Sequence, residues 1–483
     1  MKAKIFAVAA VAAVSIGAGA ARPVCLETSR FFKERATPES QGVSSKAILE
    51  WIDACDAQMK YIHGFVLVRH GRVIAEGTWA PFDTLNEPHM LYSHSKSFTS
   101  TAIGFLADEG KLDLDERIAD IFADKMPAEP SQRLLQVRVR DLLSMNFGSN
   151  PDKGARSDAN NPDWEKGILA RPMEVADPGR KHRYDSDATY LLSCIVERKS
   201  GKRTMEYLKE KLFDPLGMTS PWSTVSTSGT ACGGWGMNMT TRDIAKFGQL
   251  LLNEGVWDGK RILSKDWVRL ATSKQTATSG GPESDWAQGY GFQFWRCRHG
   301  AYRADGAAGQ FTIVMEDQDA VLSINAGDND MQRSLNLVWK HILPALGPSA
   351  LPEDAAAQAK LAERCASLKL PVLENKGIEG AALPASASFG RSDILNAGEG
   401  CLERTDSGWV LKAQGHELAI GDGKWSEIKW DFNDSNIEGA FHLVGRRRVA
   451  ASGAWKDAKT LRVRWFLVGG IQKGEFDIVA ASR

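Results

Sequence analysis

The chain has 483 residues, of which 43% are hydrophobic and 25% are charged, a composition that excludes a disordered or fibrous protein. Sixty basic residues balance sixty acidic ones, so no net field attracts nucleic acid or an anionic membrane, and neither partner is expected. At roughly 100–200 residues per domain, the length predicts two or three domains.

The first predicted element is an export signal. Lys2 and Lys4 precede an apolar run over residues 5–17, and Ala18-Gly19-Ala20 supplies small residues for cleavage. We therefore expect a signal peptide at 1–21 and an exported protein, periplasmic or secreted. The run is shorter than the roughly 20 apolar residues of a membrane span, although a retained anchor is the alternative. No later window is apolar for long enough, so no membrane span is expected after cleavage.

A helix is predicted at about 47–60, followed by a β-hairpin that turns at His70-Gly71. A second helix follows Ser93, with Gly110 placed to end it. Further helical patterns cover residues 134–144, 187–212, 241–253 and 330–343, and strand patterns cover YGFQFWRC, AYRAD, QFTIVME and AVLSINAG. Strands at both ends of this region with helices between them predict an α/β or α+β body whose ends share one antiparallel sheet.

The composition changes after Pro348. An alanine-rich helix at about 353–369 leads into short strands with turn signals such as Gly421-Asp422-Gly423. We expect a first domain at 37–347, a helical linker at 348–385 and a small, barrel-like β-rich domain at 386–483.

Several kinds of chemistry lack their motifs. Neither a P-loop nor G-x-G-x-x-G occurs, and the histidines and seven cysteines show no metal-ligand spacing, so no cofactor or metal is expected. The cysteines leave the disulfide pattern open, although an odd number cannot all pair within the chain. The absence of G-x-S-x-G excludes the nucleophile elbow of α/β-hydrolases.

The candidate nucleophile is Ser93 in the sequence Ser93-His94-Ser95-Lys96, at the start of the second predicted helix. The i, i+3 spacing puts the hydroxyl and the amine on one helix face. A helix N-terminus and a dry pocket both disfavour the lysine cation, so the amine can take the serine proton. The same spacing recurs at Ser426 and Lys429 in the β-rich tail, where no helix is expected. For the first copy, a capping serine with a solvated lysine is the alternative.

The segments LYSHSKSFTSTAIGFLADEGKL, VRVRDLLSMNFG, DPGRKHRYDSDATYLL, TTRDIAKFGQLLLNEG and YRADGAAGQFTIV follow one another along the chain. In order and spacing they resemble the penicillin-recognising serine hydrolases over roughly 37–345. The resemblance is greatest to class C β-lactamase-like enzymes, in the 6-aminohexanoate-dimer hydrolase and esterase branch. It implies a β-lactamase-like fold with a central antiparallel sheet, flanking helices and an all-helical subdomain.

This resemblance also implies roles for residues outside the first motif. The family's Y-x-N motif corresponds to Tyr184-Asp185-Ser186, which makes Tyr184 the second member of the proton relay. A buried core tyrosine is the alternative. Ser186 stands where asparagine is usual and keeps a hydrogen-bond donor on a shorter side chain. The aromatics Trp235 and Trp295 are candidates for lining the acyl pocket, with core packing as the alternative.

The third family motif, K-T-G, corresponds to Ala304-Asp305-Gly306. Gly306 retains the small residue that a strand needs where its backbone approaches the substrate. The family's oxyanion hole would then be the amides of Ser93 and Ala307. The motif's lysine, which holds an anionic carboxylate of the substrate in the family, is absent, and Asp305 adds a negative charge nearby. A neutral or cationic ester or amide is therefore expected.

The sequence predicts an exported serine hydrolase that forms an acyl-enzyme on Ser93 from a small ester or amide, with no cofactor. One alternative is a non-catalytic penicillin-binding-like protein that binds cell-wall peptide or a partner protein. Another is a true β-lactamase or D-amino-acid peptidase. The oligomeric state cannot be predicted from the sequence.

Overall fold

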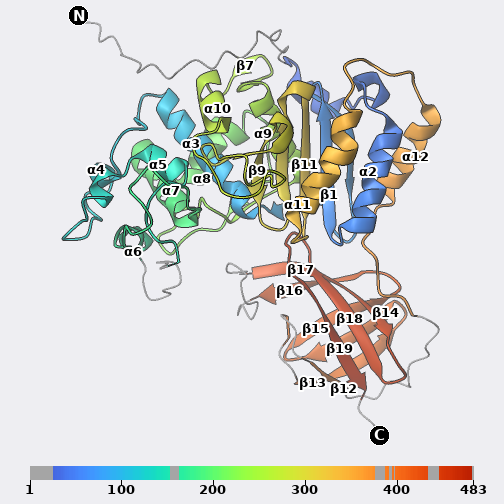
Figure 1. Cartoon of the computed structure of the whole chain (residues 1–483). Helices are drawn as coiled ribbons and strands as arrows, with labels where there is room; N and C mark the ends of the chain where they lie inside the picture. The colour runs from blue at the N-terminus through green and yellow to red at the C-terminus, as the bar shows by residue number, and fades with distance from the viewer. Residues whose placement is uncertain are drawn as a thin grey trace, which may run out of the picture.

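The computed structural model of this chain describes residues 25–152, 163–375, 387–390, 394–395, 398–432 and 445–480. The predicted signal peptide at 1–21 lies outside the described residues. A larger body of helices and strands is followed along the chain by a smaller body of strands, which lies beneath it in Figure 1.

A six-stranded antiparallel sheet forms the centre of the larger body, in the order β2-β1-β11-β10-β9-β8. β1 and β2 come from the start of this body and pair with β11 from its end, which confirms the predicted shared sheet. Every residue of β1, β9, β10 and β11 is buried, so the sheet is covered on both faces. The strands are β1 (Ile62–Arg69), β2 (Arg72–Thr78), β8 (Trp295–Arg296), β9 (Tyr302–Gly306), β10 (Gln310–Met315) and β11 (Ala320–Ala326).

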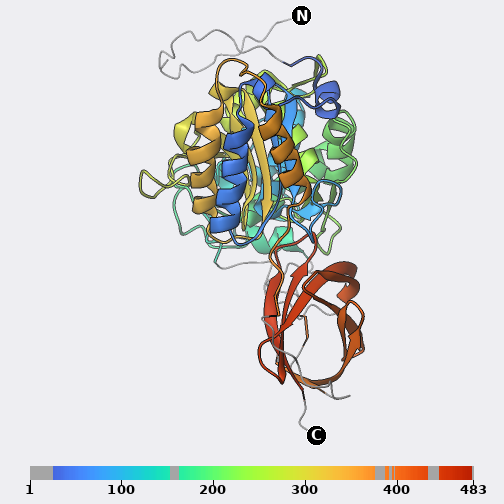
Figure 2. The same ribbon diagram turned by 90° about the vertical axis from the view of Figure 1, so that its right-hand side faces the viewer.

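Helices provide this cover. Figure 2 shows α2 (Ser45–Gln58), α11 (Met331–Leu337) and α12 (Ala355–Ala366) as one layer in front of the sheet. A π-helical turn, η7 (Val338–Ile342), continues α11 and packs against α2. α9 (Thr241–Leu252) packs on the sheet through β10, β11 and β1. α12 falls in the segment predicted as a linker, yet it packs against α2 and β2 of the larger body.

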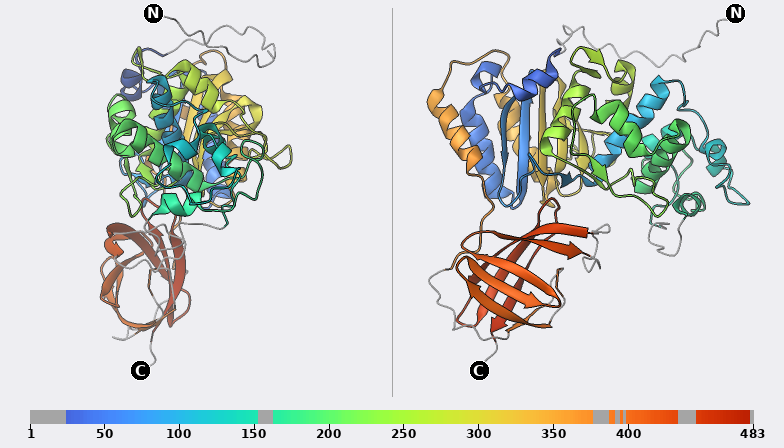
Figure 3. Two further views of the ribbon diagram at one scale, coloured as in Figure 1. Left: turned by 90° about the vertical axis from the view of Figure 1, so that its left-hand side faces the viewer. Right: turned by 180° about the vertical axis from the view of Figure 1, so that it is seen from behind.

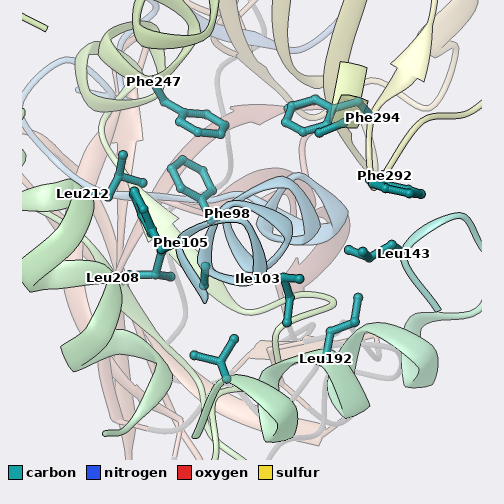
Figure 4. Packing of buried hydrophobic residues seen from close by; sticks show 14 of the residues in the cluster. Phe98, Ile103, Phe105, Leu143, Leu192, Leu208, Leu212, Phe247, Phe292 and Phe294 are labelled. Atoms are coloured by element: carbon teal, nitrogen blue, oxygen red, sulfur yellow. The ribbon is translucent and has the colours of Figure 1, made fainter. Parts of the chain in front are cut away.

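A helical region lies beside the sheet, at the end away from α12 (Figure 3, right). At its centre is α3 (Ser95–Asp108), in which every residue from Ser95 to Leu106 is buried. Phe98 of α3 stacks on Phe247 of α9 with ring centroids 4.2 Å apart, within the cluster drawn in Figure 4. This packing fixes the start of α3. The surrounding helices are α4 (Ile118–Ile121), α5 (Val139–Leu143), α6 (Trp164–Leu169), α7 (Ser186–Ser200), α8 (Thr204–Leu208) and α10 (Lys265–Thr272).

Two predicted elements differ in the structure. The helical pattern at 187–212 is divided, because α7 ends before Gly201, whose φ of 72° closes the helix in the left-handed region. α8 then begins at Thr204 and continues into a π-helical turn, η4 (Lys209–Phe213). The predicted strand YGFQFWRC contains only the two residues of β8, since Gln293 adopts a φ of 67° that no strand accommodates.

Eight strands build the smaller body, in the order β15-β14-β13-β12-β19-β18-β17-β16. An additional parallel pairing of β15 with β17 closes this sheet into a barrel, which confirms the predicted C-terminal β-rich domain. Buried tryptophans, including Trp409 and Trp465, fill its interior. The strands are β12 (Ala387–Phe389), β13 (Gly398–Thr405), β14 (Gly408–Ala413), β15 (His416–Asp422), β16 (Ser426–Phe432), β17 (Gly445–Trp455), β18 (Thr460–Leu467) and β19 (Lys473–Ala480).

Short elements complete the larger body. A three-stranded sheet of β3 (His89–Met90), β5 (Met237–Met239) and β4 (Trp222–Ser223) leads into a 3₁₀ turn, η2 (Tyr92–His94), at the start of α3. The others are α1 (Thr28–Lys33), β6 (Val256–Trp257), β7 (Lys260–Arg261), η1 (Glu39–Gln41), η3 (Leu134–Gln136), η5 (Arg298–Gly300), η6 (Glu316–Gln318) and η8 (Leu343–Ala345).

Over the described residues, which include all seven cysteines, no disulfide forms. Within the same ranges, no group of three or more histidine, cysteine or acidic side chains is arranged to hold a metal ion. A search of the described part of the chain found no helix with the length and apolar character needed to cross a membrane.

Candidate active site

The candidate nucleophile, Ser93, lies in η2, directly before α3. β3 pairs with β5 and sets the path of the chain into this turn. Ser95 ties the turn to β5, since its Oγ donates to the Tyr92 carbonyl at 2.6 Å and accepts from the Met237 amide at 3.1 Å. Ser93 itself is half-buried. The Ser93 hydroxyl is thus held at the edge of the core, because the backbone on both sides of Ser93 is fixed.

Lys96 is buried, with 1% of its surface exposed, and its amine is directed at the nucleophile. Nζ lies 3.0 Å from Ser93 Oγ, 3.0 Å from Ser186 Oγ and 2.6 Å from the Gly234 carbonyl oxygen. The i, i+3 spacing from η2 into α3 therefore does bring the predicted serine–lysine pair into contact. A hydroxyl within hydrogen-bond reach of an oriented amine is the arrangement of an activated nucleophile.

Tyr184 lies in the loop before α7, and its partly exposed ring lines the site. The Lys96 amine lies 4.8 Å from the ring centroid, and the ring stacks on Trp295 with centroids 5.9 Å apart. Desolvation raises the pKa of the Tyr184 phenol, and its hydrogen bond with the Ser93 side chain opposes this rise. The structure thus brings together Ser93 and Lys96 from the η2–α3 segment and Tyr184 from the loop before α7.

A buried ion-pair group fixes the Tyr184 loop. Asp185 caps α7 by accepting from the Asp187 amide at 2.9 Å. Arg171 bridges both carboxylates, at 2.5 Å to Asp185 and 3.0 Å to Asp187, and the three side chains are at most 2% exposed. Arg171 thus ties Asp185, which directly follows Tyr184, to the first turn of α7 and fixes the course of the loop.

The end of β9 passes directly beside the Ser93 turn. A Cβ atom on Gly306 would lie only 2.1 Å from the Leu91 carbonyl oxygen and 3.1 Å from the His94 amide nitrogen, so only glycine fits here. Ala307 follows and is exposed, with its carbonyl held by the Gln310 side chain at 3.1 Å. The close approach of Gly306 to the nucleophile turn therefore places the next residue, Ala307, beside that turn, which is where the proposed oxyanion strand must lie.

Asp305 is buried, and its charge is paired within the same strand. Its Oδ2 lies 2.7 Å from Nε of Arg303, two residues earlier on the same strand face. Burial raises the pKa of the Asp305 carboxyl, while Arg303 and Lys96 oppose the rise. Ala304, which stands in the place of the family lysine, is a buried apolar side chain. The negative charge expected from the sequence is therefore largely compensated by Arg303.

Sequence reasoning missed two parts of the site. One is the Gly234 carbonyl that holds the Lys96 amine; only the tertiary fold could reveal it, since the two residues are 138 positions apart. The other is Arg303, whose alternation with Asp305 on a predicted strand was a usable signal. Of the two tryptophans singled out, Trp295 lies against Tyr184, whereas Trp235 is buried and stacks on Trp164 with centroids 6.2 Å apart.

The second serine–lysine spacing offers a comparison within the same chain. Ser426 and Lys429 lie on strand β16, where side chains three residues apart point to opposite faces. The spacing thus yields a serine–amine pair where η2 leads into α3, and it cannot do so on β16.

Comparisons with known proteins extend this description. A family model described as Beta-lactamase matches residues 52–345. The 6-aminohexanoate-dimer hydrolase of Paenarthrobacter ureafaciens is 26% identical over 250 residues, which cover 48% of this chain and 63% of that protein. Penicillin-binding protein 4 of Amycolatopsis lactamdurans is 28% identical over 313 residues, or 56% of this chain and 79% of that one.

A candidate 6-aminohexanoate-dimer hydrolase structure from Bacillus anthracis superposes with a TM-score of 0.52 at 20% identity, covering 68% of this chain and 92% of that one. This likeness shows the fold. The chain spans less than two thirds of the Paenarthrobacter hydrolase.

Proposed function

The chain belongs to the beta-lactamase family of serine hydrolases, and from this premise we propose that it cleaves a carboxylic ester or amide through an acyl-enzyme on Ser93. The observation that carries the proposal is the buried Lys96 amine, 3.0 Å from Ser93 Oγ and oriented by Gly234 and Ser186. A solvated lysine beside a capping serine would need no such enclosure.

In the proposed reaction, neutral Lys96 accepts the proton of Ser93 while Oγ attacks the carbonyl carbon of the substrate. The amides of Ser93 and Ala307 stabilise the resulting oxyanion, which is supported by the contact of Gly306 with the nucleophile turn. Tyr184 relays the proton to the leaving alcohol or amine, and the acyl-enzyme forms. Water then attacks the ester carbonyl, Ser93 recovers its proton, and the carboxylic acid departs.

The substrate that we propose is a small ester or amide that is neutral or cationic near the reacting carbonyl. No lysine stands at Ala304 to hold a substrate carboxylate, and Arg303 is fully buried and committed to Asp305. Tyr184 and Trp295 offer an aromatic wall, which favours an apolar or cationic group on one side of the bond. The Paenarthrobacter relative is named as a hydrolase of a 6-aminohexanoate dimer, which makes that dimer a substrate to test.

We further propose that the protein acts after export, on the basis of the sequence signal at 1–21. The proposed chemistry needs only side chains and backbone amides, and thus no cofactor.

The test compares purified mature protein with Ser93→Ala on p-nitrophenyl butyrate, nitrocefin and the 6-aminohexanoate dimer, together with covalent labelling by a fluorophosphonate. Ser426→Ala is the matched control, because it removes a serine of the same spacing from β16. We expect ester or amide turnover and labelling in the wild type and in Ser426→Ala, and neither in Ser93→Ala.

Failure of the wild type to turn over any substrate or to be labelled would refute the proposal in favour of a binding protein. Nitrocefin turnover well above that of the ester would instead indicate a β-lactamase.

A further inference from the structure

The backbone that leads into Ser93 is packed into the barrel. Met90 and Tyr92, which precede the nucleophile, are 4% and 7% exposed and belong to the same hydrophobic cluster as Trp465 and Leu467 of β18. Over the described residues, the cluster that fills the barrel thus extends into the larger body at Met90 and Tyr92. A change in the packing of these two side chains against the barrel would therefore shift the backbone of the next residue, Ser93.

The barrel turn, by which we mean residues 468–473 (the connection between β18 and β19 and the first residue of β19), also bonds to this segment. The Gly469 carbonyl accepts from the Met90 amide at 2.8 Å, and Gln472 Nε2 donates to the Tyr92 hydroxyl at 2.9 Å. The other end of the Gln472 amide, Oε1, accepts from the Ile471 amide at 3.2 Å. With both ends of its side chain engaged, Gln472 presents a fixed donor to Tyr92.

Tyr92 needs such support because of its backbone. Its φ of 49° lies in the left-handed region, which a bulky side chain enters only where its surroundings hold it. Relaxation of this residue would rotate the peptide that joins it to Ser93 and would move both the hydroxyl and the amide of the nucleophile. The same amide is one of the two proposed oxyanion donors.

The barrel turn reaches the other proposed donor as well. Lys473 Nζ donates to the Gly327 carbonyl at 2.6 Å and lies 4.3 Å from the Tyr61 ring centroid. The next residue, Asp328, donates its amide to the Ala308 carbonyl at 3.1 Å, directly beside Ala307. Two consecutive residues of the barrel turn, Gln472 and Lys473, therefore support both sides of the proposed oxyanion hole through their hydrogen bonds.

We propose that the barrel turn is a positioning element of the active site, in which Gln472 is a positioning residue that holds Tyr92 and thereby Ser93. This inference rests on the proposed function. The barrel is then required for catalysis because it positions Ser93, independently of any ligand that the barrel itself binds.

The test is a double-mutant cycle in the full chain. Gln472→Leu removes the donor, Tyr92→Phe removes the acceptor while keeping the ring in the barrel cluster, and the double variant removes both. Glu475→Leu is the matched control, since this exposed residue three positions along β19 pairs with Arg464. For each variant we would measure kcat and KM for p-nitrophenyl butyrate, the rate of fluorophosphonate labelling and the melting temperature.

Each single variant should lower kcat and the labelling rate by about 10-fold with little change in KM, because small displacements of reacting groups are costly. The double variant should be no slower than either single one, and Glu475→Leu should match the wild type. If Gln472→Leu fails to fold, Tyr92→Phe still decides the question.

Wild-type kcat and labelling in Tyr92→Phe, or losses in both single variants equal to that of Glu475→Leu, would overturn the positioning role alone. A wild-type protein that is neither active nor labelled would overturn this role together with the proposed function.

Discussion

Replacing Gly306 by alanine tests how closely β9 must approach the nucleophile turn. The added Cβ would lie 2.1 Å from the Leu91 carbonyl oxygen, whereas a carbon and a carbonyl oxygen ordinarily approach to about 3.3 Å. The strand must therefore retreat by roughly 1 Å. A misplacement of that size costs about 10²-fold in rate, equivalent to about 2.7 kcal/mol of transition-state stabilisation. Because Ala307 moves with the strand, loss of its oxyanion contact would give the same size of effect.

The assay follows kcat for p-nitrophenyl butyrate and the rate of fluorophosphonate labelling of Ser93, with urea unfolding to check the fold. Gly281→Ala is the control, because its Cβ would meet no atom within 4 Å. We expect Gly281→Ala to behave as the wild type. A folded Gly306→Ala protein with wild-type kcat would refute the reasoning, since β9 would then not be required at this distance.

Three further changes have defined outcomes. Lys96→Arg should lower kcat and the labelling rate by roughly 10³-fold, because a guanidinium stays charged and cannot accept the serine proton. Stopped-flow measurement of the acylation rate tests this, and a rate near that of the wild type would exclude Lys96 as the base. Arg171→Leu should lower the free energy of unfolding by about 3–5 kcal/mol in urea titrations, since it removes the cation that pairs with the buried Asp185 and Asp187 carboxylates. Burial lowers the pKa of His94 to about 3, so the unfolded chain binds the proton first as the pH falls below about 6.5. As the pH falls from 6.5 to 3, His94 should therefore lower the free energy of unfolding by about 1.4 kcal/mol per pH unit. His94→Leu should remove that part of the pH dependence, which urea titrations at several pH values would measure.

The fold and the centre of the site followed from short-range patterns. The period of apolar residues after Ser93 predicted α3, and the i, i+3 spacing predicted the contact between Ser93 and Lys96 that the structure contains. The shared antiparallel sheet and the C-terminal barrel followed from strand patterns and turn signals. The individual helices and strands depend on residues close in sequence, where periodicity carries the information, whereas the pairing of β1 with β11 was inferred from the order of the elements.

The remaining features depend on contacts that no local pattern encodes. The Gly234 carbonyl and the Gln472 amide reach the site across 138 and 380 residues of sequence. The ion pair between Asp305 and Arg303 could not be predicted from the carried-over motif, which does not include Arg303. A family motif names the residues that react, and the environment that sets their charge and position comes from the whole fold.

The hydrogen bond from Gln472 to Tyr92 also has a consequence for the order in which this protein matures. It joins the connection between the last two described strands to Tyr92, 380 residues earlier in the sequence. During synthesis, the serine, lysine and tyrosine leave the ribosome long before the barrel turn does, and domains tend to fold as they emerge. On the role proposed for the barrel, the hydrolase body can fold early but becomes fully active only when the barrel turn is in place.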